Sequence, residues 1–98
     1  MTMDSRPRVG RRCIVSGRVQ GVYYRASAQQ RALQAGIVGY ARNLEDGSVE
    51  VLACGEEPAV LKFIDWLWIG PSAAKVVGVT VEIVELDASA WPRGFRTS

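Results

Sequence analysis

Residues 17–25 form a glycine-bearing segment between an apolar run at 13–15 and a Gln- and Ala-rich stretch without Gly or Pro. This pattern predicts a strand, a tight loop and then a helix. The first N–H groups of a helix lack helical acceptors and lie at the positive end of its dipole, so such a loop is suited to an anion. Gly17 and Gly21 let the backbone curl around a ligand, and Arg25 adds a guanidinium. The alternative is an ordinary strand-to-helix turn with a solvated arginine.

The absence of histidine limits the chemistry of this chain of 98 residues, which is long enough for one domain. Without imidazole, and with two cysteines far apart, we expect no metal site and no histidine base. A net charge of +2 is too small to indicate a polyanionic partner. No apolar run is long enough to span a membrane, so we expect a cytoplasmic protein. Residues 1–10, which mix Arg, Pro, Ser and Gly, are expected to form a flexible lead-in.

The remaining chain alternates between strand and helix patterns. The predicted elements are a strand over 12–17, a helix over about 24–34, strands over 37–43 and 48–54, a helix from Pro58 to just before Gly70, and a strand over 76–86. Right-handed crossovers and one hairpin arrange this βαββαβ order as an α+β, ferredoxin-like split βαβ sandwich. Its four-stranded antiparallel sheet has the order 4-1-3-2, with both helices on one face. The tail around Trp91 and Phe95 is irregular and could add a short edge strand.

Apolar spacing also predicts which side chains are buried. The first helix has the stripe Tyr24, Ala28, Ala32 and Leu33, and the second has Val60, Phe63, Ile64, Leu67 and Trp68. Trp66 falls outside that stripe and is expected to be partly exposed. In the last strand Val77, Val79, Val81 and Ile83 form one apolar face, which predicts a half-buried strand.

The two cysteines lie on strands predicted to be antiparallel neighbours. Cys13 begins the first strand and Cys54 ends the third, so their side chains could lie opposite one another and form a disulfide. A cytoplasmic setting favours free thiols instead. The sequence alone leaves both possibilities open.

Two motifs carry a resemblance that covers most of the chain. The first comprises Gly17, Val19, Gln20, Gly21, Val22, Tyr24 and Arg25, and the second comprises Gly39, Arg42, Asn43, Asp46, Gly47, Val49 and Glu50. In this order and spacing they resemble the paired motifs of the acylphosphatase family, with correspondence from about residue 12 to 86. Residues 11–98 are then expected to form one acylphosphatase-like domain. Tyr24 stands where the family usually has Phe, Ala41 where it usually has Val, and the end after Phe95 is shortened, which leaves the last edge strand open.

The resemblance implies a hydrolase that cleaves the carboxyl-phosphate bond of acyl phosphates to a carboxylate and inorganic phosphate. It implies that Arg25 grips the phosphate and that Asn43 positions the attacking water. The residues implied to bind the substrate, chiefly through backbone N–H groups, are Gln20, Gly21, Val22, Tyr23 and Tyr24. No cofactor is expected, nor a nucleic-acid or membrane partner. We expect a monomer whose ligands are a small acyl phosphate and inorganic phosphate.

Elementary chemistry agrees with this assignment. Asn43 ends the second predicted strand, which runs parallel to the first, so it should lie at the same sheet end as the 17–25 loop. An acyl phosphate expels a carboxylate, whose pKa of about 4 makes a general acid unnecessary. Positioning and charge stabilisation can then suffice. The family implies that the substrate's own phosphate accepts the proton of the water. Without the resemblance, Asn43 would be interpreted as a polar residue closing a hairpin.

Two other functions fit the same fold. An RNA-binding module would use the open face of the sheet, but residues 48–54 contain no aromatic side chain and no Lys or Arg. An anion-binding regulatory domain without turnover would keep the same loop. Salt-dependent retention on heparin tests the first alternative, and a rate measurement on a carboxyl phosphate tests the second.

Overall fold

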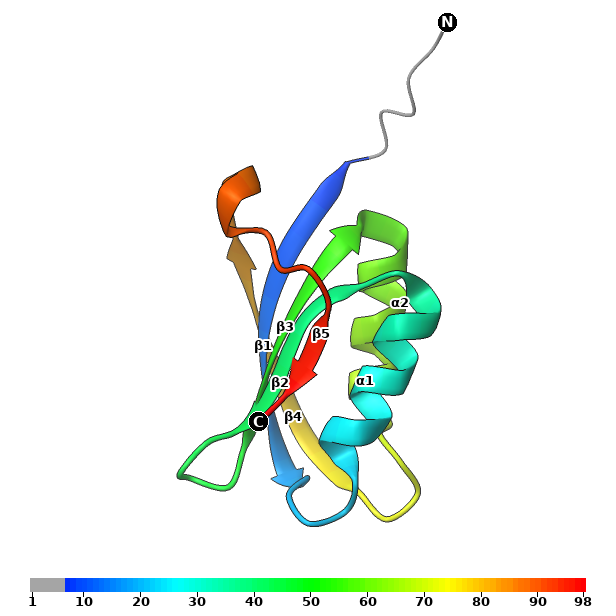
Figure 1. Cartoon of the computed structure of the whole chain (residues 1–98). Coiled ribbons are helices and arrows are strands. Elements are labelled where there is room, and N and C mark those ends of the chain that lie inside the picture. The colour runs from blue at the N-terminus through cyan, green and yellow to red at the C-terminus, as the bar shows by residue number, and fades with distance from the viewer. Residues whose placement is uncertain (1–6) are drawn as a thin grey trace, which may run out of the picture.

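The computed structural model describes residues 7–98 as a five-stranded sheet with helices packed on one face (Figure 1). The elements are β1 (Arg8–Arg18), α1 (Tyr24–Ala35), β2 (Val38–Asn43), β3 (Val49–Glu56), α2 (Glu57–Leu67), β4 (Lys75–Val84), the 3₁₀ turn η1 (Ala88–Ala90) and β5 (Phe95–Thr97). The strand order is β4-β1-β3-β2-β5. The predicted α+β fold is confirmed, including the order 4-1-3-2 for the first four strands and the helices on one face.

The sheet has one strand more than the four predicted. β5 pairs in parallel with β2, so the sheet is mixed rather than wholly antiparallel. A strand of three residues has no periodic pattern that a sequence could show. β1 begins at Arg8 rather than at 12, because residues 8–11 pair with residues 53–56 of β3. Residues 8–10 of the predicted lead-in therefore belong to the sheet, and residues 1–6 lie outside the described residues.

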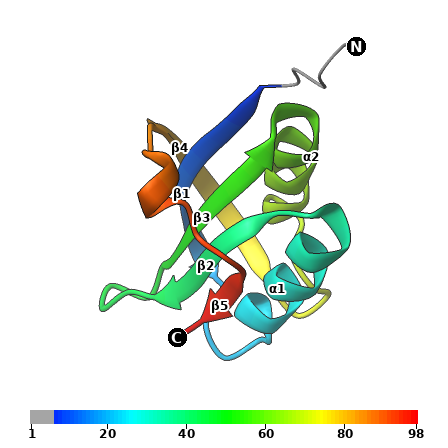
Figure 2. The same cartoon turned by 45° about the horizontal axis from the view of Figure 1, so that its top comes forward.

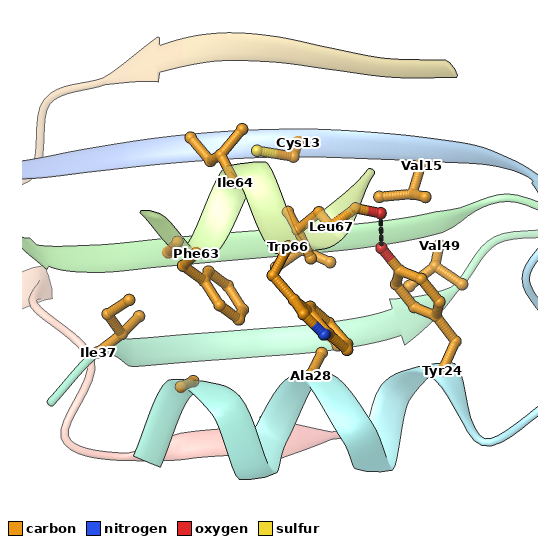
Figure 3. Close-up of a cluster of buried hydrophobic side chains, with 14 of the residues drawn as sticks. Cys13, Val15, Tyr24, Ala28, Ile37, Val49, Phe63, Ile64, Trp66 and Leu67 are labelled. Carbon is orange, nitrogen blue, oxygen red and sulfur yellow. Dashed lines mark hydrogen bonds between the residues drawn. The ribbon is translucent and has the colours of Figure 1, made fainter. Parts of the chain in front are cut away.

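The core between the sheet and the helices contains aromatic side chains from both helices (Figure 3). The ring of Trp66 lies 5.7 Å from that of Tyr24 and 6.3 Å from that of Phe63, centroid to centroid. Trp66 is therefore buried, whereas Trp68 is 50% exposed, so both predictions for these tryptophans were wrong. The periodicity of a helix does not show which flank a neighbouring helix covers. Here α1, with its small Ala28, covers the flank that carries Trp66.

Two further predictions of burial were wrong in whole or in part. Leu33 of α1 is 61% exposed. On β4, Val79 is partly buried and packs against the core, but Val77, Val81 and Ile83 are 75%, 48% and 70% exposed. β4 is an edge strand, and α2 packs over β1 and β3, which leaves much of β4 uncovered. A register shift in the β1–β4 ladder also interrupts the alternation of β4 side chains between the two faces of the sheet.

The two cysteines lie on opposite faces of the sheet. Cys13 belongs to the core under the helices, and its partner in the register is Val51. Cys54 pairs with Gly10 instead, and it alternates with the core residue Ala53, so its side chain lies on the other face. Both thiols are free and buried, so of the two possibilities that the sequence left open, the structure has free thiols. Burial raises the pKa of the Cys13 thiol to about 11, which keeps it protonated and unreactive at neutral pH.

Tyr24→Phe should lower the free energy of unfolding by about 1–2 kcal/mol, because it leaves a buried acceptor unpaired. The buried Tyr24 hydroxyl donates a hydrogen bond of 2.6 Å to the carbonyl oxygen of Leu67 at the end of α2 (Figure 3). Urea unfolding followed by circular dichroism measures the change. Tyr23→Phe is the matched control, because Tyr23 is 84% exposed and should unfold like the wild type. Equal stability of both variants would contradict this role for the Tyr24 hydroxyl.

Candidate active site

A cavity of about 330 Å³ lies at the end of the sheet where β1 and β2 both finish. β1 and β2 run in the same direction because each is antiparallel to β3 (Figure 1). The loop that follows β1 and the last residue of β2 therefore meet. The lining residues are Val19, Gly21, Tyr23, Tyr24, Arg25, Ala26, Asn43 and Thr97. The two sequence motifs thus converge on one cavity.

The backbone of the loop between β1 and α1 is curled. Gly21 and Tyr23 both have positive φ angles, of 74° and 62°, on either side of Val22. Alternation of left-handed and other conformations turns successive N–H groups toward a common point, a geometry that binds anions. Tyr23 is the N-cap of α1, makes no side-chain capping hydrogen bond, and is followed by a first turn without an acidic residue. A positive φ at a tyrosine costs of order 1–3 kcal/mol, a strain that typically marks a functional site.

Arg25 contacts Ser98, the residue that directly follows β5. Its Nη1 donates a hydrogen bond to the backbone oxygen of Ser98. One turn further along α1, Gln29 Nε2 donates to the carbonyl oxygen of Phe95 at 2.8 Å. Ser98 in turn donates its backbone N–H to the oxygen of Ala41 at 3.1 Å, which fixes it to β2. The edge strand β5, which the sequence left open, therefore brings Ser98 to the guanidinium of Arg25.

Asn43 and Gln20 have different environments at the hairpin between β2 and β3. The side chain of Asn43 is exposed, and among residues 7–98 nothing accepts or donates a hydrogen bond with its amide. Gln20 Nε2 instead donates to the carbonyl oxygens of Leu44 and Ser48, both at 2.9 Å. Gln20 therefore ties the anion-binding loop to the hairpin, while the Asn43 amide remains available to a ligand or water.

The cavity brings together most of the residues predicted from the sequence: Gly21, Tyr23, Tyr24, Arg25 and Asn43. Gln20 and Val22 do not line it. Val22 packs against the core, and Gln20 contacts the hairpin. The side chain of Tyr24 points into the core, so only its backbone is available to a ligand.

Sequence analysis missed the lining residues Val19, Ala26 and Thr97, and the contact of Ser98 with Arg25. Val19 and Ala26 flank predicted site residues, so their position in the chain was a usable signal. Thr97 and Ser98 are far from both motifs in sequence. Only the pairing of β5 with β2 brings them to the cavity, and three residues are too few to predict that pairing.

Residues 7–98 contain neither a candidate metal site nor a candidate membrane-spanning helix. No group of three or more His, Cys, Asp or Glu side chains there is placed to hold a metal ion. In the same range no helix has the length and apolar content needed to cross a membrane.

The fold and cavity define a small α+β domain with a curled glycine loop, an arginine and an asparagine at one end of its sheet. The family model described as acylphosphatase matches residues 11–97, and the chain belongs to this family of enzymes. The resemblance found in the sequence is thereby confirmed.

Curated relatives and solved structures agree with this assignment. The acylphosphatase of Halorhodospira halophila is 53% identical over 79 residues, which cover 81% of this chain and 86% of the relative. That of Alkalilimnicola ehrlichii is 51% identical over 86 residues, covering 88% and 93%. The structure of an acylphosphatase from Coxiella burnetii superposes with a TM-score of 0.86 at 34% identity, over 100% of both chains.

Proposed function

We propose that this enzyme hydrolyses acyl phosphates to a carboxylate and inorganic phosphate, with the curled loop and Arg25 binding the phosphate and Asn43 orienting the water. The proposal rests on one observation. Gly21, Arg25 and Asn43, which come from two separate motifs, line the same cavity. The guanidinium of Arg25 and the uncapped N–H groups can bind the phosphate, and the side-chain amide of Asn43 can bind the water. Such a reaction needs these groups.

Phosphate binding rests on the loop and on α1. The N–H groups around Gly21 and at the uncapped start of α1 are suited to the phosphate oxygens. Arg25 donates one of its N–H groups to Ser98, and a guanidinium has five such groups, so others remain for a second phosphate oxygen. These donors stabilise the charge on the equatorial oxygens in the transition state.

The chemical step needs a nucleophile and little else. A water held by the Asn43 amide attacks phosphorus, the bond from phosphorus to the acyl oxygen breaks, and a carboxylate leaves. The carboxylate leaves unprotonated because its pKa is about 4. The proton of the water passes to a phosphate oxygen, which fits a cavity whose lining contains no His, Asp or Glu.

The direct test is the rate of phosphate release by the purified chain from acetyl phosphate, compared with that from p-nitrophenyl phosphate. A phosphate monoester expels a more basic oxygen and profits from a general acid, so it should be hydrolysed far more slowly. Equal rates on the two compounds would contradict the proposed mechanism. Binding of phosphate without turnover of acetyl phosphate would instead support an anion-binding regulatory domain.

Gly21→Val should raise the inhibition constant for inorganic phosphate by about tenfold or more, equivalent to at least 1.4 kcal/mol of binding energy. Gly21 has a φ of 74°, where a β-branched residue is strained, although an added Cβ would meet no atom within 4 Å. The fold should survive while the curl of the loop changes. Competitive inhibition by phosphate measures the effect, with circular dichroism as the control for folding. Unchanged phosphate inhibition would count against the loop as the phosphate site.

We further propose that the enzyme is cytoplasmic and monomeric. Free thiols are compatible with a reducing compartment, although the positions of Cys13 and Cys54 on opposite faces of the sheet would keep them apart in any compartment. Sedimentation tests the monomer, and cell fractionation tests the location.

A further inference from the structure

The segment that links β4 to β5 crosses the face of the sheet that the helices leave uncovered (Figure 2). The segment has to cross one face of the sheet because β4 and β5 form its opposite edges. Beside it lies a cavity of about 570 Å³, which we call the open-face cavity. Its lining includes Tyr40 and Leu52 from the sheet and Ala90 and Pro92 from the crossing segment. Pockets for small ligands usually measure about 300–1,000 Å³.

Three arginines line this cavity: Arg42, Arg93 and Arg96. Arg42 Nε lies 2.5 Å from Glu50 Oε1, so its charge is compensated. Arg93 and Arg96 have no carboxylate partner within the described part of the chain. Arg96 lies next to Tyr40 in the β2–β5 register, which puts its side chain on the uncovered face. Two exposed and uncompensated guanidinium groups therefore lie beside a concave surface.

Glu50 does not neutralise these two arginines. It is only 2% exposed, and its oxygens already accept hydrogen bonds from Arg42, Arg12 and Tyr40. Burial alone would raise the pKa of Glu50, but the hydrogen bonds outweigh it and hold that pKa below its usual value. The carboxylate is thus charged and fully engaged. Its contacts fix the Tyr40 ring, which has the Arg42 guanidinium 5.6 Å from its centroid.

The rest of the lining is mixed in polarity. Thr97 and Ser98 are polar, whereas Tyr40 offers an aromatic ring and Leu52, Pro92 and Ala90 offer aliphatic surface. A free phosphate ion would use the arginines but leave this surface unfilled. A ligand with a planar ring and a chain of phosphates would use both, because arginine forks bind phosphate oxygens and rings pack on aromatic and guanidinium faces.

We propose that the open-face cavity binds a nucleoside polyphosphate. Its phosphates contact Arg93 and Arg96, and its base packs against Tyr40 and Pro92. This site is distinct from the proposed phosphate site, because Gly21, Arg25 and Asn43 line the other cavity. Thr97 of β5 borders both cavities.

The test is calorimetric titration of the whole chain with ATP, in wild type and in two double variants of equal charge. Arg93→Ala/Arg96→Ala should weaken ATP binding by about tenfold or more. Lys62→Ala/Lys75→Ala removes the same charge from exposed positions outside the open-face cavity and should change the affinity by less than about twofold. Arg25→Ala should likewise retain ATP binding, which separates this site from the catalytic one.

Tripolyphosphate is the second probe, because it carries the phosphates without the ring. It should bind at least about tenfold more weakly than ATP. Equal binding of the two would overturn the base contact with Tyr40. The absence of saturable ATP binding, an equal loss in the lysine variant, or loss in Arg25→Ala would each overturn the site.

Discussion

Arg25→Ala should depress turnover of acetyl phosphate and raise the inhibition constant for inorganic phosphate together. Arg25 is proposed to contact the phosphate in both the ground state and the transition state, so its loss weakens both. The contact of a guanidinium with a phosphate in a partly enclosed site should contribute about 3–4 kcal/mol. Its removal should therefore lower kcat/KM by a factor of roughly 10² to 10³. Steady-state kinetics with acetyl phosphate, and phosphate as a competitive inhibitor, measure the two effects.

Two further variants make this experiment specific. Arg31→Ala removes the same charge from the same helix but outside the cavity, where the guanidinium lies over Trp66, and it should retain near-normal kinetics. Arg25→Lys keeps the charge but loses the planar fork, so it should recover only part of the activity. If folded Arg25→Ala binds phosphate as tightly as the wild type, the cavity is not the phosphate site.

The topology and most of the site were predictable from the sequence. The topology follows from hydrophobic patterns that repeat along each strand and helix, and the site residues lie in two short motifs. Alternation of strands and helices, with right-handed crossovers, leads to one sheet order, and that order puts the end of β2 beside the loop after β1. The sequence alone therefore predicts that Asn43 and Arg25 lie close together. The positive φ of Gly21 also follows from local chain chemistry, since a glycine in a tight strand-to-helix loop favours it.

What the sequence could not show depends on contacts between distant segments. Trp66 is buried because α1 covers one flank of α2, and the exposure of Trp68 has the same origin. Val77, Val81 and Ile83 of β4 are exposed because an edge strand extends beyond the helices, which no alternation pattern records. Cys13 and Cys54 differ in face because of the register of β1 against β3. Ser98 reaches Arg25 only through the pairing of β5.

Asn43→Ala should reduce turnover of acetyl phosphate by about a hundredfold or more and leave the inhibition constant for phosphate nearly unchanged. Its amide is proposed to orient the water, a contribution made only on the way to the transition state. The affinity for phosphate depends on Arg25 and the loop instead. Arg25→Ala should therefore change both turnover and phosphate inhibition, whereas Asn43→Ala should change turnover alone. A fall in kcat with constant phosphate inhibition is the expected signature.

A slipped hairpin would imitate this loss, so folding must be tested separately. The β2–β3 ladder pairs Asn43 with Val49, and the turn is closed by the hydrogen bond of 2.9 Å from Leu44 N–H to the oxygen of Ser48. These are backbone contacts that alanine at position 43 retains. Glu45→Ala changes an exposed side chain in the same turn and should keep full activity. If folded Asn43→Ala turns over like the wild type, the water is oriented by another group, and if its phosphate affinity falls with turnover, Asn43 contacts the phosphate itself.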